Sequence, residues 1–297
     1  MLRNVQILLK DEWKEQADLL QADLEKQKIG CRCVRSPEDI DTASLQTTVL
    51  LTDDRKAAAE WKRLGGICIG CTRSNEFFDG AELATDSLQE LDRITIEETL
   101  LHGLGLPVTI AATERLVIRE IAEADAACLY QMSLQVGMEY LFRDSQNENG
   151  TVENCFAPER MLSYIKTVYR FCGYGLWGVW IKGGKLIGCC GLSDPQQETM
   201  QTEGELELQY MLAPEEQHKG YGAEMCCAAL DYAFERIQCE QVSVRIHKEN
   251  EPSIRLAFRL GFTFDQTEDA GIEAYRLKKE EWIKHKMNEN KKVEKSS

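Results

Sequence analysis

The first hundred residues contain short apolar runs separated by segments in which apolar residues recur every three or four positions. The runs lie at residues 5–9, 30–34, 48–52, 67–70 and 82–85. Runs of this length predict strands, and the spacing of apolar residues from Trp13 to Leu24 predicts a helix. Alternating strands and helices predict a parallel sheet covered by helices, which is an α/β architecture.

Turn and capping residues set the expected limits of these helices. Ser36-Pro37, followed by two acidic residues, predicts a helix start. A further helix is expected over residues 54–64, because Gly65-Gly66 follows it and glycine commonly ends helices. The glycine-containing segment 99–111 predicts a linker, so we expect a first domain at residues 1–108.

The second half of the chain has a different order of apolar patterns. Strands are expected at 113–121, 175–182, 185–191, 203–212, 241–246 and 272–277, and helices at 123–136, 220–237 and 251–260. Gly183-Gly184 predicts a two-residue hairpin turn between the second and third of these strands. We therefore expect a second domain at residues 109–284. The lysine-rich residues 285–297 are expected to form a polar, disordered tail.

The chain has 297 residues with a net charge of −15, and 43% of its residues are hydrophobic. This composition is that of a globular protein with enough apolar material for two cores. No apolar run approaches the roughly 18 residues of a membrane span, and the start of the chain lacks a secretory signal, so we expect a cytoplasmic protein without a membrane partner. Acidic residues in both halves argue against a nucleic-acid partner and suit a cationic molecule or a basic peptide. The same charge also serves solubility alone.

Cysteine is abundant, with twelve residues in the chain. In a cytoplasmic protein they are expected to be thiols. The motifs Cys31-x-Cys33 and Cys68-x-x-Cys71 together offer four zinc ligands, but both fall in segments predicted to be buried strands. We therefore expect these cysteines, and the adjacent pairs at 189–190 and 226–227, to pack in cores, and we expect no metal site.

The segment most informative about chemistry is a glycine-containing loop between an expected strand and an expected helix, with the pattern Gln217-x-x-Gly220-x-Gly222. Main-chain N–H groups at a helix start lack partners and have partial positive charge, so they attract phosphate groups. The two glycines remove side chains that would block a pyrophosphate, and Gln217 and Lys219 supply further donors. Glycine pairs also occur at ordinary helix starts. The order of strands and helices around this loop favours the anion site.

Residues 113–282 resemble the GNAT acetyltransferase family, and within it the branch of ribosomal-protein N-terminal acetyltransferases. The resemblance lies in four segments that follow the family's order: 113–119 (TERLVIR), 122–125 (AEAD), 207–223 (ELQYMLAPEEQHKGYGA) and 250–262 (NEPSIRLAFRLGF). It implies an α+β domain with a mixed, mostly antiparallel central sheet.

The resemblance also implies acetyl-CoA as cosubstrate, lying in a V-shaped opening between two central strands. The pantetheine arm would pair with the main chain of Tyr210, Met211 and Leu212, which could also polarise the thioester. The pyrophosphate would be held by Gln217, Lys219, Gly220, Tyr221, Gly222 and Ala223, and the cofactor would lie beside Asn250 and Ser253. An amine of a small molecule or of a peptide N-terminus would attack the thioester directly.

An attacking amine must lose a proton, and Glu207 is the expected base because related enzymes often place a glutamate at this strand position. Glu205, two residues earlier on the same face, is the substitute. The alternative is that both carboxylates only line an exposed strand face. Many family members have a tyrosine as general acid seven residues after the asparagine, but here that position is Ala257, so the general acid is unassigned. The early helices and residues 144–160 are expected to build the acceptor pocket.

Residues 49–70 and 80–91 resemble the last third of a HAD-type hydrolase. In that family an acidic pair at this strand end binds magnesium, a role open to Asp53 and Asp54, which would otherwise cap the next helix. The nucleophilic aspartate of the family's D-x-D motif is missing from residues 7–12. We therefore expect a degenerate HAD-like or Rossmann-like domain without hydrolase activity, which recognises the acceptor, binds a partner or forms a homodimer. The alternatives to an acetyltransferase are a non-catalytic acetyl-CoA sensor and, less favoured, a HAD-type phosphatase.

Overall fold

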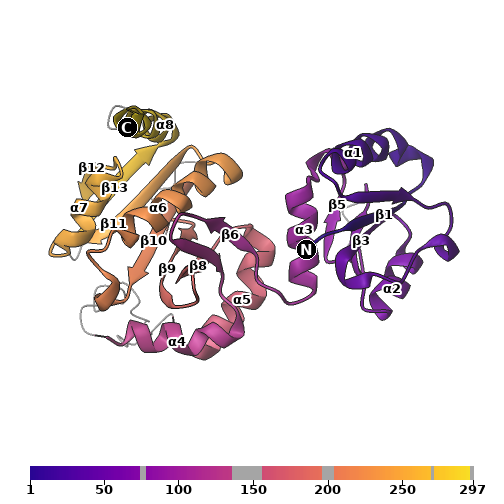
Figure 1. The fold of residues 1–297 in the computed structure, drawn as a ribbon, viewed down its shortest axis with the longest axis horizontal. Helices are drawn as coiled ribbons and strands as arrows, with labels where there is room; N and C mark the ends of the chain where they lie inside the picture. Colours follow the sequence, from indigo (N-terminus) through magenta and orange to yellow (C-terminus); the bar gives the residue numbers. More distant parts are fainter. Residues whose placement is uncertain (74–77, 136–155, 196–203, 269–270, 295–297) are drawn as a thin grey trace. The chain divides into compact units, whose positions relative to one another are not determined.

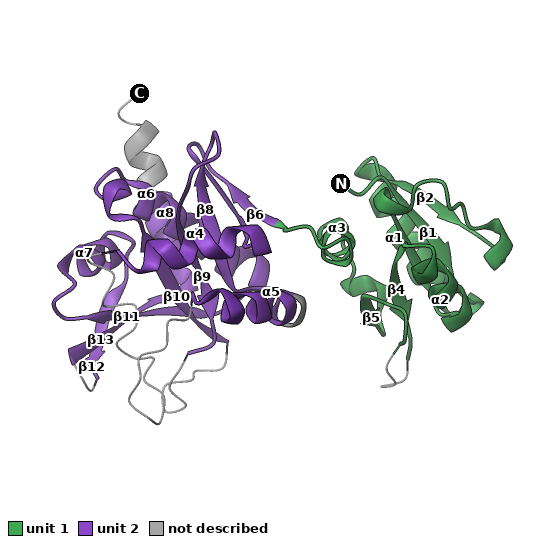
Figure 2. Cartoon of the chain, turned by 90° about the horizontal axis from the view of Figure 1, so that it is seen from below, with its two compact units in different colours: residues 1–108 green, residues 109–297 purple. Residues whose placement is uncertain are grey.

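The computed structural model describes residues 1–73, 78–135, 156–195, 204–268 and 271–294. The chain divides into two compact units, Met1–Val108 and Thr109–Ser297, and each unit contains its own sheet (Figure 2). Among the described residues, no helix is both long and apolar enough to cross a bilayer.

The sheet of the first unit consists of parallel strands. They are β1 (Asn4–Leu8), β2 (Gly30–Cys33), β3 (Thr48–Thr52), β4 (Ile67–Cys71) and β5 (Leu83–Thr85). Their order across the sheet is β2-β1-β3-β4-β5, and every neighbouring pair is parallel. The predicted Rossmann-like architecture of parallel strands is therefore confirmed for this unit.

Helices cover both faces of this sheet (Figure 1). One face packs against α1 (Lys14–Lys26) and α3 (Arg93–Gly103), and the other packs against α2 (Arg55–Arg63). The Trp61 side chain of α2 is 2% exposed, and its Nε1 donates to the carbonyl oxygen of Ile67 at 2.9 Å. That hydrogen bond satisfies the one polar atom of a large apolar side chain, so α2 is fixed on the strand that follows it.

The predicted helix at Ser36 and the predicted linker differ from the structure of the first unit. The predicted helix start at Ser36 gives only a single 3-10 turn, Pro37–Asp39, and the chain is extended again at Ile40. The side chain of Gln6 exchanges two hydrogen bonds of 2.8 Å with the main chain of Asp41, which holds the segment in its extended course. The predicted linker at 99–111 also overlaps α3, which begins at an Asp92 cap and continues to Gly103.

The sheet of the second unit is mixed. It is made of β6 (Thr109–Ala112), β7 (Leu116–Glu120), β8 (Leu176–Ile181), β9 (Leu186–Ser193), β10 (Glu205–Leu212), β11 (Gln241–His247), β12 (Thr263–Thr267) and β13 (Ile272–Lys278), in the order β12-β13-β11-β10-β9-β8-β7-β6. Only the β10–β11 pair is parallel among the pairs of described strands, and the others are antiparallel. The predicted mixed, mostly antiparallel sheet is confirmed. The predicted hairpin between β8 and β9 is also present, since Gly183 and Gly184 both have positive φ angles, which glycine adopts without strain.

The two faces of this sheet are covered by different helices. Helices α6 (Tyr221–Asp231), α7 (Glu251–Arg259) and α8 (Lys279–Glu294) pack with one face, and α6 continues as a π-helical turn over Tyr232–Ile237. Helices α4 (Glu123–Ser133) and α5 (Pro158–Cys172) pack with the other face. Along β10 the even-numbered residues Leu206 and Leu208 belong to the α6 side, whereas Met211 belongs to the α4 side.

The second unit differs from the sequence prediction at several elements, and helix α5 and strand β6 were not predicted. The predicted strand at 113–121 begins only at Leu116, because residues 113–115 form the turn of a hairpin with β6. Strand β12, which was not predicted, pairs with β13. The predicted disordered tail from His285 is instead part of α8, which continues to Glu294.

Helix α8 forms despite its polar sequence because one tryptophan fixes it to the core. Trp282 is 2% exposed, and its Nε1 donates to Asp231 Oδ1 at 2.9 Å. Lys286 Nζ lies 2.6 Å from the other oxygen of Asp231. Lysine and glutamate are good helix formers, so an anchored first turn suffices for the following turns to form.

Replacing Trp282 with alanine is expected to destabilise the second unit by about 3–5 kcal/mol, because a large buried side chain and its hydrogen bond are lost together. The free energy of unfolding can be measured by urea denaturation followed by circular dichroism. The matched control is Met287→Ala on the same helix, where the side chain is 56% exposed and the change is expected to cost less than about 0.5 kcal/mol. Equal effects of the two substitutions would contradict the anchoring role of Trp282.

Candidate active site

The two central strands of the second sheet separate along their length. The parallel pairing of β10 with β11 extends only from Glu205 opposite Gln241 to Glu207 opposite Ser243. Beyond that point β10 continues to Leu212 while it pairs with β9 on its other side, and β11 continues to His247 while it pairs with β13. The strands therefore diverge, and the main chain of β10 after Glu207 faces an opening.

Helix α6 begins at the end of this opening. Its N-cap is Gly220, whose φ of 85° lies in the left-handed region that disfavours residues with a Cβ. The N–H of Glu224 donates to Gly220 O at 3.2 Å, so the preceding N–H groups of Tyr221, Gly222 and Ala223 have no acceptor within the helix. Three unpaired donors at the positive end of a helix dipole are suited to an anion.

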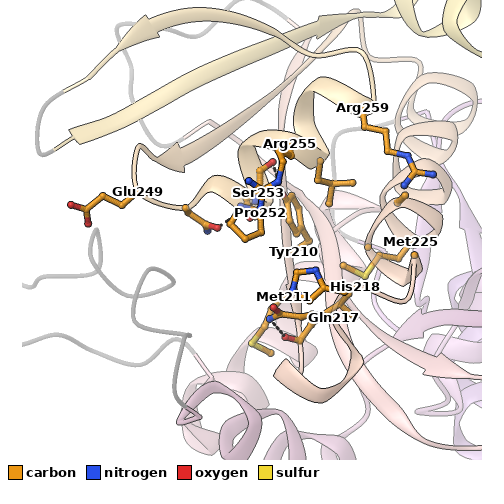
Figure 3. A pocket seen from close by; sticks show the side chains of 16 residues that line it. Tyr210, Met211, Gln217, His218, Met225, Glu249, Pro252, Ser253, Arg255 and Arg259 are labelled. Atoms are coloured by element: carbon orange, nitrogen blue, oxygen red, sulfur yellow. Dashed lines mark hydrogen bonds between the residues drawn. The ribbon is translucent and has the colours of Figure 1, made fainter.

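A cavity of about 460 Å³ lies along β10, the start of α6 and the helix α7 (Figure 3). Its lining residues are Tyr210, Met211, Leu212, Gln217, His218, Gly220, Gly222, Ala223, Met225, Glu249, Asn250, Pro252, Ser253, Arg255, Leu256 and Arg259. Figure 3 shows Glu249 and Arg259 at opposite ends of this cavity. The cavity is therefore an elongated channel that can accept a long, anionic, partly apolar ligand.

The glycine of the first helical turn keeps this channel open. A Cβ at Gly222 would lie 3.3 Å from Leu256 Cδ2 and 3.6 Å from Leu212 Cδ1. Leu256 and Leu212 belong to the two walls of the channel. A longer side chain at Gly222 would therefore fill the space between α6 and α7.

Most residues predicted from sequence to bind the cofactor line this cavity, but two do not. Lys219 directs its Nζ to Glu216 Oε2 at 2.9 Å, and Lys185 lies 2.6 Å from the other oxygen of Glu216. These two lysines hold the pKa of Glu216 below its ordinary value. The Tyr221 ring lies under the guanidinium of Arg115, at 4.5 Å from ring centroid to Cζ. Lys219 and Tyr221 thus belong to the wall behind the loop and contribute main-chain atoms to the turn.

The remaining polar side chains of the channel are tied to its walls. Gln217 Nε2 donates to Leu212 O at 3.2 Å, which closes the loop onto the end of β10. The Tyr210 hydroxyl donates to Ser253 O at 3.4 Å, and burial raises the pKa of this hydroxyl, so it stays protonated. Asn250 is the N-cap of α7, because its Oδ1 accepts from the N–H of Ser253 at 3.3 Å. Ala257, at the position of the family's tyrosine, is buried.

The cap role of Asn250 gives a testable expectation. Asn250→Ala is expected to lower the free energy of unfolding by about 1 kcal/mol, because a Ser253 N–H at the helix start loses its acceptor. Asn250→Asp keeps an oxygen acceptor at the cap and is expected to retain wild-type stability. Thermal or urea unfolding of both variants measures this, and equal losses in the two would show that Oδ1 is not the cap.

The two candidate carboxylates lie at the point where β10 and β11 separate. Glu207 is 5% exposed, lies opposite Ser193 on β9 and Ser243 on β11, and is on the α4 side of the sheet with Met211. Glu205 is on the same side, and its Oε1 lies 3.4 Å from Nε of Arg276. The alternative of an exposed strand face is wrong, since both carboxylates are buried. The carboxylate of Glu205 is thus held in an ion pair with an arginine.

The two channel arginines of α7 and His218 were not predicted from the sequence. Arg255 and Arg259 are four residues apart and both line the channel, although Arg255 is also 2.9 Å from Glu251. Their spacing of four residues could have predicted from the sequence that both arginines lie on one face of the helix. His218 has a φ of 59°, a backbone conformation that is uncommon for residues other than glycine. The predicted acceptor segment 144–160 falls largely outside the described residues.

The predicted ligands of the first unit have other roles. Asp54 caps α2 by accepting from the N–H groups of Lys56 and Ala57, and Asp53 lies 3.6 Å from Lys10 Nζ. No group of three or more histidine, cysteine or acidic side chains is gathered for a metal among the described residues.

The cysteines divide between buried and exposed positions. Cys68, Cys71, Cys190 and Cys226 are buried, and burial raises their thiol pKa values, that of Cys68 to about 12. Packing in cores is confirmed for these residues. The prediction that residues 30–34 form a buried strand is wrong, since β2 is an edge strand and Cys33 is exposed.

Comparison with known proteins agrees with this geometry. A family profile described as an acetyltransferase (GNAT) domain matches residues 115–263, which is half of the chain. The chain is similar to the uncharacterized protein YkkB of Bacillus subtilis (strain 168), with 35% identity over 99 residues, covering 32% of this chain and 55% of YkkB. It is similar to the uncharacterized N-acetyltransferase YoaA of the same organism, with 25% identity, covering 52% of this chain and 82% of YoaA. The chain thus spans little more than half the length of YkkB.

Among solved structures, the chain is similar to a spermidine N-acetyltransferase from Vibrio cholerae in complex with CoA and spermine. The identity is 17% and the TM-score 0.47, with 58% of this chain and 99% of that chain covered. The matched region belongs to the second unit in the profile comparison, and residues 1–108 lie outside it.

Proposed function

The chain belongs to the GNAT family of acetyltransferases, and from this premise we propose that its second unit transfers the acetyl group of acetyl-CoA to an amine. The observation that supports this most directly is the channel that extends from Tyr210–Leu212 of β10, beyond the point where β10 and β11 separate, to the glycine-capped start of α6. The thioester end of acetyl-CoA needs the free main chain of β10, and its pyrophosphate needs the start of α6. One channel provides both.

In the proposed complex the pyrophosphate lies at the free N–H groups of Tyr221, Gly222 and Ala223. The absence of a Cβ at Gly220 and Gly222 leaves room for the phosphate oxygens. The pantetheine arm extends along the unpaired edge of β10 past Tyr210 and Leu212, where its amides hydrogen-bond to the main chain. Met211 and Leu256 supply the apolar contacts of the channel walls.

The proposed chemistry is direct attack of a neutral amine on the thioester carbonyl. The main-chain donors of β10 stabilise the oxyanion that forms. The C–N bond forms, the C–S bond breaks, and the thiolate of CoA leaves. The proton of the attacking amine passes to the Glu207 carboxylate, directly or through a water molecule. Tyr210 is protonated but bonded to Ser253 O, and Ala257 has no donor, so the thiolate leaves without an assigned general acid.

The amine is proposed to enter from the α4 side of the sheet, opposite the cofactor helices. Glu207 faces this side, together with Ser193, Ser243 and the arginine-bound Glu205. Buried carboxylates on this side of the sheet favour an acceptor that arrives with positive charge and delivers a proton. This supports a small-molecule amine or a peptide N-terminus as acceptor.

The first unit is proposed to be a Rossmann-like domain without hydrolase activity. The residues available for a magnesium site are engaged elsewhere, because Asp54 caps α2 and Lys10 lies beside Asp53. A lysine next to a carboxylate neutralises the charge that would attract a divalent cation.

The proposal is tested by incubating the full chain with acetyl-CoA and a panel of polyamines, amino acids and peptides with free N-termini. Mass spectrometry is expected to find an acceptor that gains one acetyl group, and the reaction is expected to release free CoA thiol. CoA binding without acetylated product over the whole panel would favour an acetyl-CoA sensor. Absence of CoA binding in calorimetry would overturn the proposed cofactor site.

A further inference from the structure

Strands β10 and β11 each place one polar side chain at the start of their opening, on the α4 side of the sheet. The last parallel pair is Glu207 with Ser243, so Gln209 and Arg245 are the next residues on this side of the two strands. Side chains two residues apart on a strand point to the same face and are separated by about 6–7 Å. Gln209 and Arg245 therefore flank the place where the amine is proposed to reach Glu207.

The amide group of Gln209 is oriented by a hydrogen bond to the neighbouring strand. Gln209 is partly exposed, and its Nε2 donates to the hydroxyl of Ser193 on β9 at 3.2 Å. Ser193 lies opposite Glu207, so this hydrogen bond holds Gln209 beside the candidate base. With its nitrogen bonded to Ser193, the side chain presents Oε1, which can accept a hydrogen bond from an N–H group of a ligand.

Arg245 has a carboxylate partner within the protein. Its Nε and Nη2 atoms both lie 2.8 Å from Oε2 of Glu268, the residue that follows β12. The side chain of Arg245 is 13% exposed and that of Glu268 is 4% exposed. Charge-assisted hydrogen bonds of this kind are strong, and the pair has almost no net charge. A carboxylate of a ligand would have to displace Glu268 in order to bind Arg245.

A second arginine on this side of the sheet is also paired. Arg276 of β13 lies opposite Ser243, and its guanidinium lies 3.4 Å from Glu205 and 2.8 Å from Asp265. The Glu205 side chain is 1% exposed, so this contact is shielded from water. The two arginines beside the candidate base therefore balance carboxylates of the protein and are not open to a carboxylate of the acceptor.

We propose that the acceptor is an amine without a carboxylate on the adjacent carbon, such as a peptide N-terminus, an amino acid amide or an alkyl diamine. Gln209 is then a positioning residue whose Oε1 accepts from an N–H group of the acceptor, and the Arg245–Glu268 pair determines specificity. A free amino acid would bring its carboxylate close to Glu207 and to arginines that are already paired, and burial of an unpaired carboxylate is unfavourable. The inference rests on the proposed function, since it concerns the acceptor of the same transfer.

The test compares alanine with alaninamide as acceptors for the full chain and acetyl-CoA. Rates are expressed per concentration of unprotonated amine, because the two amines differ in pKa. The wild type is expected to have a kcat/KM for alaninamide at least about tenfold above that for alanine. Glu268→Gln releases Arg245 and is expected to reduce this ratio at least about threefold by improving the use of alanine. The matched control is Glu60→Gln, which releases the exposed Arg63 of the first unit and is expected to retain the wild-type ratio.

The role of Gln209 is tested separately and does not depend on the folding of Glu268→Gln. Gln209→Leu is expected to raise the KM for alaninamide by about five- to tenfold, because a hydrogen bond to the acceptor is lost. Its kcat is expected to stay within about threefold of the wild type. The affinity for CoA is expected to be unchanged, since Gln209 is not among the residues that line the cofactor channel. Equal losses of CoA affinity and of acceptor binding would show a structural role instead.

The outcomes separate this inference from the proposed function. A wild-type kcat/KM for alanine equal to or above that for alaninamide would overturn the inference and leave the proposed function standing. An unchanged ratio in a folded Glu268→Gln variant would overturn the role assigned to the Arg245–Glu268 pair. If neither probe reacts, acetylation of any free amino acid in the panel would overturn the inference, and product confined to amines without an adjacent carboxylate would support it. Absence of product over the whole panel would overturn the proposed function itself.

Discussion

Replacing Gly220 with glutamate is expected to lower the affinity for CoA by at least about 100-fold, which corresponds to about 2.7 kcal/mol of binding free energy. The new carboxylate would stand at the N-cap of α6, where it accepts from the free N–H groups and repels a pyrophosphate. The affinity of the purified full chain for CoA can be measured by isothermal calorimetry. Binding equal to that of the wild type would show that the pyrophosphate lies elsewhere.

Gly65→Glu provides the matched control for this substitution. Gly65 has a φ of 86° against 85° for Gly220, and a Cβ at Gly65 would meet nothing within 4 Å. Both substitutions are therefore expected to cost about 1–2 kcal/mol of stability from left-handed strain. Only Gly220→Glu is expected to affect CoA affinity. A comparable loss of CoA affinity in both variants would assign the effect to the strain of a left-handed residue or to the added negative charge.

Helices and strands could be predicted from the sequence where the spacing of apolar residues indicated an element and a glycine marked its end. Strand β3 and helix α2 are examples, because Thr48–Thr52 is continuously apolar apart from its ends and Gly65 closes the helix that follows. The loop at Gly220 could also be predicted, because a glycine between a strand and a helix permits a left-handed turn and leaves the N–H groups of the helix open to an anion. These features depend on interactions within a few residues of each other.

The missed elements depend on contacts between distant residues. The first turn of helix α3 contains Ile94, Thr95 and Ile96, whose branched side chains favour strands. The helix forms because Ile96 and Leu100 are buried against the sheet. Helix α8 is polar along most of its length, and its contact between Trp282 and Asp231 joins residues 51 positions apart. No local pattern in the sequence predicts such a contact.

The residues of the candidate site also divide into those that local sequence patterns predict and those that depend on the packing of distant segments. Gly222 and Asn250 could be selected from local patterns, and both line the channel. Arg259 of α7 and His285 of α8 line the same cavity as Gly220 only because the helices α6, α7 and α8 pack together. The side chain of Lys219 was predicted to reach the cofactor, but the nearby Glu216 holds its ammonium group away from the channel. This contact is local, since the carboxylate lies only three residues earlier in the sequence.

Glu207→Gln is expected to lower kcat by about 10²–10⁴-fold, the usual contribution of a general base, because glutamine keeps the shape of the side chain but cannot take the amine proton. The affinity for CoA is expected to remain at the wild-type value, since Glu207 lies where β10 and β11 separate and is not among the residues that line the cofactor channel. Steady-state release of CoA thiol gives kcat, and calorimetry gives the affinity.

Glu205→Gln is the control that separates the two carboxylates. Glu205 is one pleat away on the same side of the sheet, but its carboxylate is bonded to Arg276, which also lies 2.8 Å from Asp265. Its replacement is therefore expected to lower the free energy of unfolding, because Arg276 loses a buried partner, while kcat of the folded protein stays within a few-fold of the wild type. If Glu205→Gln abolishes turnover and Glu207→Gln does not, the base is Glu205. If neither does, the amine loses its proton to solvent before it enters the site.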